Sequence, residues 1–291
     1  MELRQLRYLV AVYAEGSISR AAAHLLLSQP ALTRQIRALE REMGVVLFER
    51  TSTGVRPTAS GTALHTHAVQ ILRLADQSRE VARSAAPVRE RVDVGLPPGV
   101  PQHWLRSVLA QIRASVPAAG VTFLDAASSD QLRMLAEGTL DVGIVHQNPP
   151  DTLRHVPVLA EPFGVAIRPG HRLAGTEPCR LADLDDVVVL AHGRDQVPAE
   201  HDRMVLAAHE SGVRPQWRFV RFSENALLCA EAVDADAVLL SHTTAARLLP
   251  DWPWRRLVEP QVDLRTWVAH PVLTRSVVRA VAGAIVATAP G

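Results

Sequence analysis

The stretch SISRAAAHLLLSQPALTRQIRALEREMGVVLFER, residues 17–50, decides the fold of the N-terminal part of the chain. It predicts two short helices joined by a tight turn. In the first helix, Ala21, Ala22 and Leu25 form a narrow apolar face. Because the two alanines are small, a neighbouring helix can approach them closely. The pattern therefore predicts a helical hairpin with a tightly packed first helix.

The second helix is predicted to begin at the segment Ser28-Gln29-Pro30. A Ser can cap the free amides of a helix start, and Pro is tolerated in the first turn because those amides have no partner there. Apolar residues then recur at helical spacing and are expected to face inward: Leu32, Ile36, Leu39 and Met43.

The opposite face of this helix carries residue types that read DNA. Gln and Arg can each make paired hydrogen bonds to a base edge, and Thr can contact a base or a phosphate. We predict base readout by Gln29 and Arg34 and backbone or minor-groove contact by Thr33 and Arg37, with Ser28 and Pro30 at the front end of the same surface. The alternative is a polar helix face that only meets water.

A β-hairpin is predicted for residues 45–57. Two short extended pieces flank Thr51-Ser52-Thr53-Gly54, where polar residues and a Gly lie between apolar flanks. Arg50 and Arg56 stand on either side of this turn and are expected to contact phosphates or the minor groove. The alternative for both is an ordinary solvated Arg.

From Leu3 to Gly61 the chain resembles the winged helix-turn-helix of the LysR-type transcriptional regulators. In that family the predicted hairpin is the wing. The resemblance rests on an ordered series of residues: Leu3-x-x-Leu6-x-x-Leu9, Gly16-Ser17, Ala21-Ala22, Leu25, Ser28-Gln29-Pro30-Ala31-Leu32-Thr33, Ile36, Leu39-Glu40, Gly44, Leu47-Phe48-x-Arg50 and Thr58-x-x-Gly61.

Helices are also predicted on both sides of this region. Residues 1–14 form an amphipathic helix whose inward side chains are expected to be Leu3, Leu6, Leu9, Val10 and Tyr13. Thr58 to about Ala86 contains no Pro, which predicts a helix of about 28 residues and roughly 42 Å. Its apolar stripe consists of Leu64, Ala68, Ile71, Leu72, Ala75 and Ala82.

We expect this stripe to lack a partner in its own small domain and to pair with the same helix of a second subunit. The alternative is that it lies on the C-terminal domain of its own chain. The resemblance implies the first arrangement, a linker helix in an antiparallel dimer, and commonly a tetramer built from two dimers. Two recognition helices would then reach successive major grooves, about 34 Å apart.

The C-terminal part alternates short apolar runs with helical patterns, which favours parallel sheets with crossover helices. Strands are expected at residues 92–96, 121–124, 142–145, 163–167, 187–190, 217–222, 237–240 and 266–270. Residues 132–144 and 169–174 resemble regulatory-domain motifs of the same family. The resemblance implies a fold like that of periplasmic binding proteins, in which two α/β subdomains enclose a cleft.

The predicted fold class is therefore α/β with an N-terminal winged helix-turn-helix, a long linker helix and a two-subdomain effector domain. The expected boundaries are 1–58 for DNA binding, 59–88 for the linker helix and hinge, and 89–291 for the effector domain. Within the last, subdomain 1 is expected at about 89–160 and 269–291, and subdomain 2 at about 161–268.

Ligands of such folds bind at strand C-terminal ends, between the subdomains. The predicted effector-binding residues are Pro98, Gly99, Ser128, Ser129, His146, His192, Arg194 and Ser223. Alternatively, Ser128 or Ser129 only caps a helix, and His192 and Arg194 lie in a wet loop. The first loop also contains Pro97 and Pro101, and Pro lacks an amide proton. A dicarboxylate held by amides is thus less expected than a bulkier, partly apolar effector.

Charge and composition agree with a DNA-binding front end. Residues 1–91 hold 13 Arg and 8 acids, a net charge of +5, whereas the remainder holds 18 Arg and 22 acids, a net charge of −4. Two Cys offer no disulfide framework, and the 12 His form no metal signature. Catalytic and phosphate-loop motifs are missing from the sequence. We therefore expect no enzyme, no metal and no cofactor.

The first residues show no signal segment, and no apolar run reaches eighteen residues, which favours the cytoplasm and no membrane contact. The expected partners are double-stranded DNA carrying an interrupted palindrome, a small-molecule effector and further copies of the chain, with RNA polymerase as a further candidate. One alternative is a regulator without an effector, controlled by abundance or a protein partner. Another is an effector-binding or catalytic protein whose N-terminal domain only dimerises.

Overall fold

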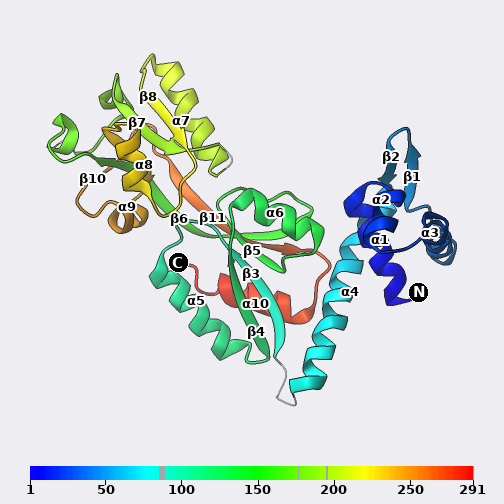
Figure 1. Ribbon diagram of the computed structural model, residues 1–291. Helices are drawn as coiled ribbons and strands as arrows, with labels where there is room; N and C mark the ends of the chain where they lie inside the picture. Colours follow the sequence, from blue (N-terminus) through cyan, green and yellow to red (C-terminus); the bar gives the residue numbers. More distant parts are fainter. Residues whose placement is uncertain (85–88, 176, 195, 291) are drawn as a thin grey trace. The chain divides into compact units, whose positions relative to one another are not determined.

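A computed structural model describes residues 1–84, 89–175, 177–194 and 196–290 (Figure 1). The chain divides into two compact units. The first comprises Met1–Val88 with Ala136–Thr139, and the second comprises Arg89–Leu135 with Leu140–Gly291. Within the described residues, no helix combines the length and the apolar character that a membrane crossing requires.

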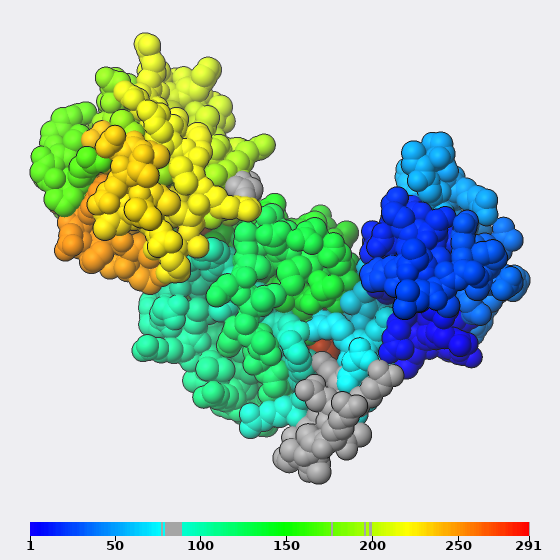
Figure 2. Space-filling view, in the orientation of Figure 1, coloured from blue at the N-terminus to red at the C-terminus, as the bar shows by residue number. Residues whose placement is uncertain are grey.

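The first unit is a helical bundle with one hairpin. Its elements are α1 (Leu3–Glu15), α2 (Ile18–His24), α3 (Gln29–Met43), β1 (Phe48–Thr51), β2 (Gly54–Pro57) and α4 (Ala59–Ser84). Figure 2 shows the hairpin as a protrusion of this unit. The core combines apolar residues from four helices and the hairpin: Leu6, Leu9, Val12, Ala21, Ala22, Leu32, Ile36, Leu39, Leu47, Phe48 and Ala68.

Side-chain caps start the two helices of the predicted hairpin. Ser17 accepts a hydrogen bond from the Arg20 amide at the start of α2, and Ser28 accepts one from the Ala31 amide at the start of α3, both at 3.4 Å. Each bond satisfies an amide that has no partner within its own helix. The predicted helix-turn-helix is confirmed, with Ala21, Ala22, Leu32 and Leu39 buried as expected.

The hairpin is attached to the end of α1 by a close backbone approach. The Val55 amide donates to the Gly16 carbonyl oxygen at 2.9 Å. A Cβ on Gly54 would lie 2.3 Å from the same oxygen, so only Gly fits at that position. This contact fixes where the hairpin leaves the helical core.

Two expectations for the first unit were wrong. Leu3 is 39% exposed, while Val12, which was not expected inside, is fully buried. The stripe on α4 does have a partner in its own domain, because Ala68 is buried in the core next to α1. The apolar residues around it, Leu64, Ile71 and Leu72, pack against the same core. The helix has 26 residues, and the expected positions 85 and 86 lie outside the described residues.

The second unit contains one sheet of nine strands in the order β4-β3-β5-β11-β6-β9-β7-β8, with β10 paired to β6. The strands are β3 (Glu90–Leu96), β4 (Ala119–Asp125), β5 (Val142–Val145), β6 (Leu153–Ile167), β7 (Val188–His192), β8 (Gln216–Val220), β9 (Ala237–Ser241), β10 (Trp254–Arg256) and β11 (Asp263–Pro271). All eight expected strands are present. The strand β10 and the first part of β6 were not expected.

The helices of this unit are α5 (Gln102–Ser115), α6 (Ser128–Glu137), α7 (Pro198–Ser211), α8 (Ala226–Ala232), α9 (His242–Leu248) and α10 (Ser276–Val286). Two 3-10 helices, η1 (Arg172–Gly175) and η2 (Leu181–Leu184), complete it. Parallel pairs (β3 with β4 and β5, β7 with β8 and β9) form the two ends of the sheet. The predicted α/β class is thus confirmed.

The strands β6 and β11 join the two halves of this unit. In β6, residues 153–162 pair with β11, and residues 163–167 pair with β9. In β11 the register shifts between Thr266 and Trp267. Leu264, before the shift, belongs to one apolar core, and Val268, after it, belongs to another. Each half therefore has its own core. Among the described strands, the pairing of β6 with β11 is the one that continues from one half into the other.

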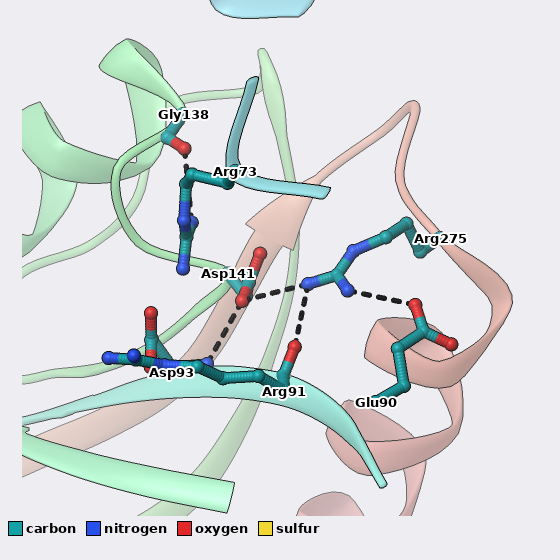
Figure 3. A network of polar contacts seen from close by, with 7 residues as sticks. All are labelled: Arg73, Glu90, Arg91, Asp93, Gly138, Asp141 and Arg275. Carbon is teal, nitrogen blue, oxygen red and sulfur yellow. Dashed lines mark hydrogen bonds and ion pairs between the residues drawn. The ribbon is translucent and has the colours of Figure 1, made fainter. Parts of the chain in front are cut away.

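A polar network joins residues at the start of β3 and β5 to Arg275, just before α10 (Figure 3). The Arg275 guanidinium, just before α10, pairs with Glu90 at 2.8 Å and with Asp141 at 3.0 Å. The same Asp141 carboxylate accepts the Asp93 amide at 2.9 Å. The side chain of Asp141 is 5% exposed, so this carboxylate is withdrawn from water, whereas the Glu90 side chain is 41% exposed. The network connects the first strand of the unit to its last helix.

Candidate functional site

The exposed side of α3 contains the residues predicted to read DNA. Gln29, Pro30, Arg34 and Arg37 are exposed, as is the capping residue Ser28. Half-buried Thr33 donates its hydroxyl to the Gln29 carbonyl at 2.9 Å. A polar edge therefore runs along the first turns of the helix, the part of a recognition helix that meets base edges.

The hairpin presents its two arginines on opposite faces. Arg56 lies opposite Glu49 in the β-ladder, and Arg50 lies opposite Val55. Because neighbouring residues of a strand alternate between faces, Arg50 and Arg56 project from different sides of the hairpin. A hairpin of this kind can contact both walls of a groove.

Four arginines of this surface have no ion-pair partner among the described residues: Arg34, Arg37, Arg50 and Arg56. Elsewhere in the same unit, Arg7 pairs with Asp76 and Arg20 pairs with Glu15. Unpaired guanidinium groups on one helix and one hairpin are suited to phosphate binding.

Between the two halves of the second unit lie two adjoining cavities. One is lined by Pro97, Pro98, Ala127, Ser128, His146, His192, Gln196 and Val197. The other is lined by Pro98, Gly99, His146, Phe163, His192, Val197, Ser223, Leu240, Ser241, Thr244 and Leu264. Each has a volume of about 20 Å³, room for about one water molecule. The cleft is therefore nearly closed in this structure.

Six of the eight residues predicted for effector binding line these cavities: Pro98, Gly99, Ser128, His146, His192 and Ser223. Ser129 lies half-buried in the first turn of α6 and is not among the lining residues of either cavity. Arg194 is exposed and makes a bidentate ion pair with Asp202 at 2.7 Å for both bonds. The structure thus brings six of the predicted side chains together and places two outside the lining.

Sequence reasoning missed several lining residues, among them Gln196, Val197, Ser241 and Thr244. Ser241 ends β9, so the rule that ligands bind at the ends of strands could have found it. Thr244 lies in the first turn of the helix that follows. Gln196 and Val197 precede α7, and no local pattern marks them as lining residues.

His146 is a buried polar residue of the cleft, with 4% of its surface exposed. Its backbone amide donates to the Ser128 hydroxyl at 2.9 Å. Its Nε2 lies 2.9 Å from the Pro98 carbonyl oxygen, and its Nδ1 lies 3.1 Å from the Thr266 hydroxyl. Since a carbonyl oxygen can only accept, Nε2 carries the proton. Burial lowers the pKa of His146 to about 4, against hydrogen bonds to backbone carbonyls that raise it. The ring is therefore neutral at pH 7.

His192 supplies an aromatic wall on the other side of the cleft. Its ring stacks on Phe222 with a centroid distance of 4.1 Å. Gln196 lies 3.3 Å from His192 Nδ1 and donates its Nε2 to the Phe222 carbonyl at 2.9 Å. These contacts hold the Gln196 amide and the His192 imidazole together in the lining of the cleft.

Metal and thiol chemistry have little support in the described part of the chain. No cluster of three His, Cys, Asp or Glu side chains there has an arrangement that could hold a metal ion. Burial raises the pKa of the Cys179 thiol to about 11, which keeps it from forming a thiolate.

Comparisons with known proteins match both parts of the chain. A family model described as "Bacterial regulatory helix-turn-helix protein, lysR family" matches residues 3–62, and one described as "LysR substrate binding domain" matches residues 85–289. The HTH-type transcriptional regulator TcbR of Pseudomonas sp. (strain P51) is 32% identical over 276 residues, which cover 91% of this chain and 90% of TcbR.

Solved structures resemble the chain over nearly its whole length. CbnR, a LysR family transcriptional regulator, is 28% identical, and the match covers 98% of this chain and 100% of CbnR with a TM-score of 0.56. Full-length CbnR complexed with its target DNA is also 28% identical, covers 100% of both chains and has a TM-score of 0.53.

Proposed function

This chain belongs to the LysR family of bacterial transcriptional regulators, and on that premise we propose which of its residues read DNA and which receive the effector. It is a DNA-binding regulator with an effector-binding domain, and its relatives are regulators rather than enzymes. The match to a substrate-binding domain over residues 85–289 does not favour a regulator without an effector.

In our proposal the DNA surface consists of the front of α3 and the hairpin. Gln29 and Arg34 read base edges in the major groove, while Thr33, Arg37, Arg50 and Arg56 contact phosphates or the minor groove. Ser28 and Pro30 bring the first turn of α3 close to the DNA. The observation that carries this assignment is the set of four exposed, unpaired arginines on one helix and one hairpin.

The proposed effector site is the cleft of the second unit. Side chains from both of its halves, including Ser128 and His146 from one and His192 and Ser223 from the other, line adjoining cavities. A ligand that contacts both halves can favour one arrangement of them over another. It shifts the population only as far as its affinities for the two arrangements differ. Ser129 and Arg194 stay predictions for the rim of this site.

We further propose that the regulator acts in the cytoplasm as a homodimer or tetramer on an interrupted palindrome. The side of α4 that does not face α1 would pair with the same helix of a second copy. Effector binding would change how two DNA-binding domains sit on their half-sites, and thereby transcription by RNA polymerase. Contact with the polymerase itself stays a prediction.

The first experiment is binding of the purified protein to its own upstream DNA. Mobility shift and footprinting at two salt concentrations are expected to reveal a protected, interrupted palindrome and a steep loss of affinity with salt. The matched variants are Arg34→Ala and Arg41→Ala, which remove the same charge two turns apart on α3. If genome-wide selection found no preferred sequence for the wild type, the proposed readout would be abandoned.

A further inference from the structure

We propose that the effector of this cleft is an uncharged molecule with an apolar body and hydroxyl or carbonyl groups. This inference rests on the proposed function, because it takes the cleft as the effector site. The first observation that supports it is the residue composition of the cavity lining. None of the described residues lining the two cavities is Asp, Glu, Arg or Lys.

The polar side chains that line the cleft carry hydroxyl, amide and imidazole groups. They are Ser128, His146, His192, Gln196, Ser223, Ser241 and Thr244. Hydroxyl and amide side chains both donate and accept, so they match hydroxyls and carbonyls equally well. The rest of the lining is apolar, with Phe163, Val197, Leu240 and Leu264 in the cavity beside Thr244. A partly apolar ligand with a few polar groups fits this mixture.

His146 does not serve as a counterion for an acid. Both of its ring nitrogens have partners, the Pro98 carbonyl and the Thr266 hydroxyl, and the residue is 4% exposed. Burial also lowers its pKa to about 4, so the imidazole is uncharged at neutral pH. An anionic ligand beside His146 would therefore face the dipole of a neutral imidazole and not the positive charge of an imidazolium.

The nearby arginines are directed elsewhere. The Arg194 guanidinium is held by the Asp202 carboxylate through two hydrogen bonds. Arg265 lies between Leu264, which lines the cleft, and Thr266, which contacts His146. Strand alternation therefore places exposed Arg265 on the opposite face of β11.

An acidic group also lies close behind the lining. Glu200, in the first turn of α7, follows the lining residue Val197 and is 4% exposed. One of its carboxylate oxygens has no hydrogen-bond partner in the described part of the chain. Burial raises the pKa of this carboxyl, against a backbone hydrogen bond from Arg265 and the charges of Arg203 and Arg265. A second carboxylate brought near this buried acid is unfavourable in a low dielectric.

The start of α6, at the lining residue Ser128, is a feature that attracts anions. Its first-turn amides present a partial positive charge of about half a unit. However, the Ser128 hydroxyl at that point already accepts the His146 amide, and the residue is 2% exposed. Half a unit charge does not neutralise a carboxylate, and still less a dicarboxylate, whereas it suits the oxygen of a carbonyl or a hydroxyl.

The test uses full-length protein and a panel of matched ligand pairs that differ only in charge, such as benzamide with benzoate and adipamide with adipate. The panel also includes the alcohols and methyl esters of the same skeletons. Thermal unfolding and titration calorimetry measure binding. We expect uncharged members to raise the unfolding midpoint, and the matching carboxylates to bind at least tenfold more weakly. Ser223→Ala, which removes a lining hydroxyl, should weaken binding of the uncharged ligands.

A second variant tests the reason for the preference. Gln196→Arg places a guanidinium in the lining, and it should bring the affinity for the carboxylate up to or above that for the matched amide. If wild-type protein bound a carboxylate better than its amide, and Ser223→Ala weakened that binding, the proposed class of effector would be overturned. A panel without any uncharged binder would also overturn it. Neither result bears on the proposed DNA binding, because the footprinting experiment measures that separately.

Discussion

The Thr244 hydroxyl lies 3.4 Å from the Gly99 carbonyl oxygen and donates to it across the cleft. Thr244 belongs to α9 in one half of the effector domain, and Gly99 belongs to the loop after β3 in the other. Gly99 has φ +91°, and a Cβ there would come within 3.1 Å of Thr244 Oγ1. The backbone at Gly99 thus approaches Thr244 closely. An effector larger than a water molecule has to move Gly99 and Thr244 apart.

Thr244→Val should loosen this closure. The substitution preserves shape but removes the donor, and one hydrogen bond contributes about 0.5–1.5 kcal/mol. We expect roughly two- to tenfold faster hydrogen exchange around Gly99 and in the first turn of α9, measured by mass spectrometry on full-length protein. Thr244→Ser, which retains the hydroxyl, is the control. Equal exchange in all three proteins would show that this bond does not hold the cleft closed.

Arg34→Ala should relax sequence preference. Losing a bidentate contact to a base edge costs about 1–3 kcal/mol of discrimination at that base pair. Selection from a randomised operator library measures the effect as lost preference at one position of each half-site. Arg41→Ala, in the last turn of α3, should lower affinity without changing the selected sequence. An unchanged profile for Arg34→Ala would place base readout elsewhere.

Arg56→Ala should weaken binding to all sequences alike. A lost phosphate contact reduces the slope of log K against log salt by about 1. Titrations at several salt concentrations, on operator and on random DNA, provide this slope. Glu49 lies opposite Arg56 in the β-ladder, and Glu49→Gln should have the reverse effect because it removes a negative charge from the same face. A loss confined to operator DNA would mean that Arg56 reads sequence.

His146 should make the effector domain sensitive to acid. Its pKa is lowered from 6.5 to about 4 in the folded protein, so the unfolded chain takes up the proton first. This contribution to stability is complete above pH 6.5 and is lost as the pH falls towards 4. At about 1.4 kcal/mol per pH unit, the loss between pH 7 and pH 5 is about 2 kcal/mol.

Urea unfolding at pH 7 and pH 5 checks this expectation against His146→Gln. The glutamine can still donate to the Pro98 carbonyl, but it does not titrate. The variant should therefore lose less stability than the wild type over this interval, and other titrating groups cancel in the comparison. Parallel losses in the two proteins would indicate that His146 titrates normally in the folded state.

Arg275→Leu should destabilise the effector domain by around 3 kcal/mol. It removes a guanidinium that pairs with the buried Asp141 carboxylate and with Glu90 (Figure 3). Arg279→Leu, one turn further along α10 and exposed, should change stability by less than about 0.5 kcal/mol. Thermal unfolding distinguishes the two. Similar midpoints for both variants would mean that solvent already screens the cluster.

Much of the DNA-binding unit could be predicted because its signals are local. Ser17 and Ser28 cap helices a few residues away, and Leu32, Ile36 and Leu39 follow the helical period. The strands of the effector domain were also found from their own composition. The partner of the α4 stripe was not found, because the packing of Ala68 against the core that includes α1 involves residues far away in the sequence.

By itself, the sequence determined the order of helices and strands, the exposed arginines and the strand ends that meet in a cleft. Local hydrogen bonds and side-chain periodicity decide these features within a few residues. Only the tertiary structure decided that Thr244 meets Gly99, which is 145 residues away, and that His146 is buried deeply enough to stay neutral. Such properties depend on which distant groups exclude water from a side chain, and a linear pattern does not specify that.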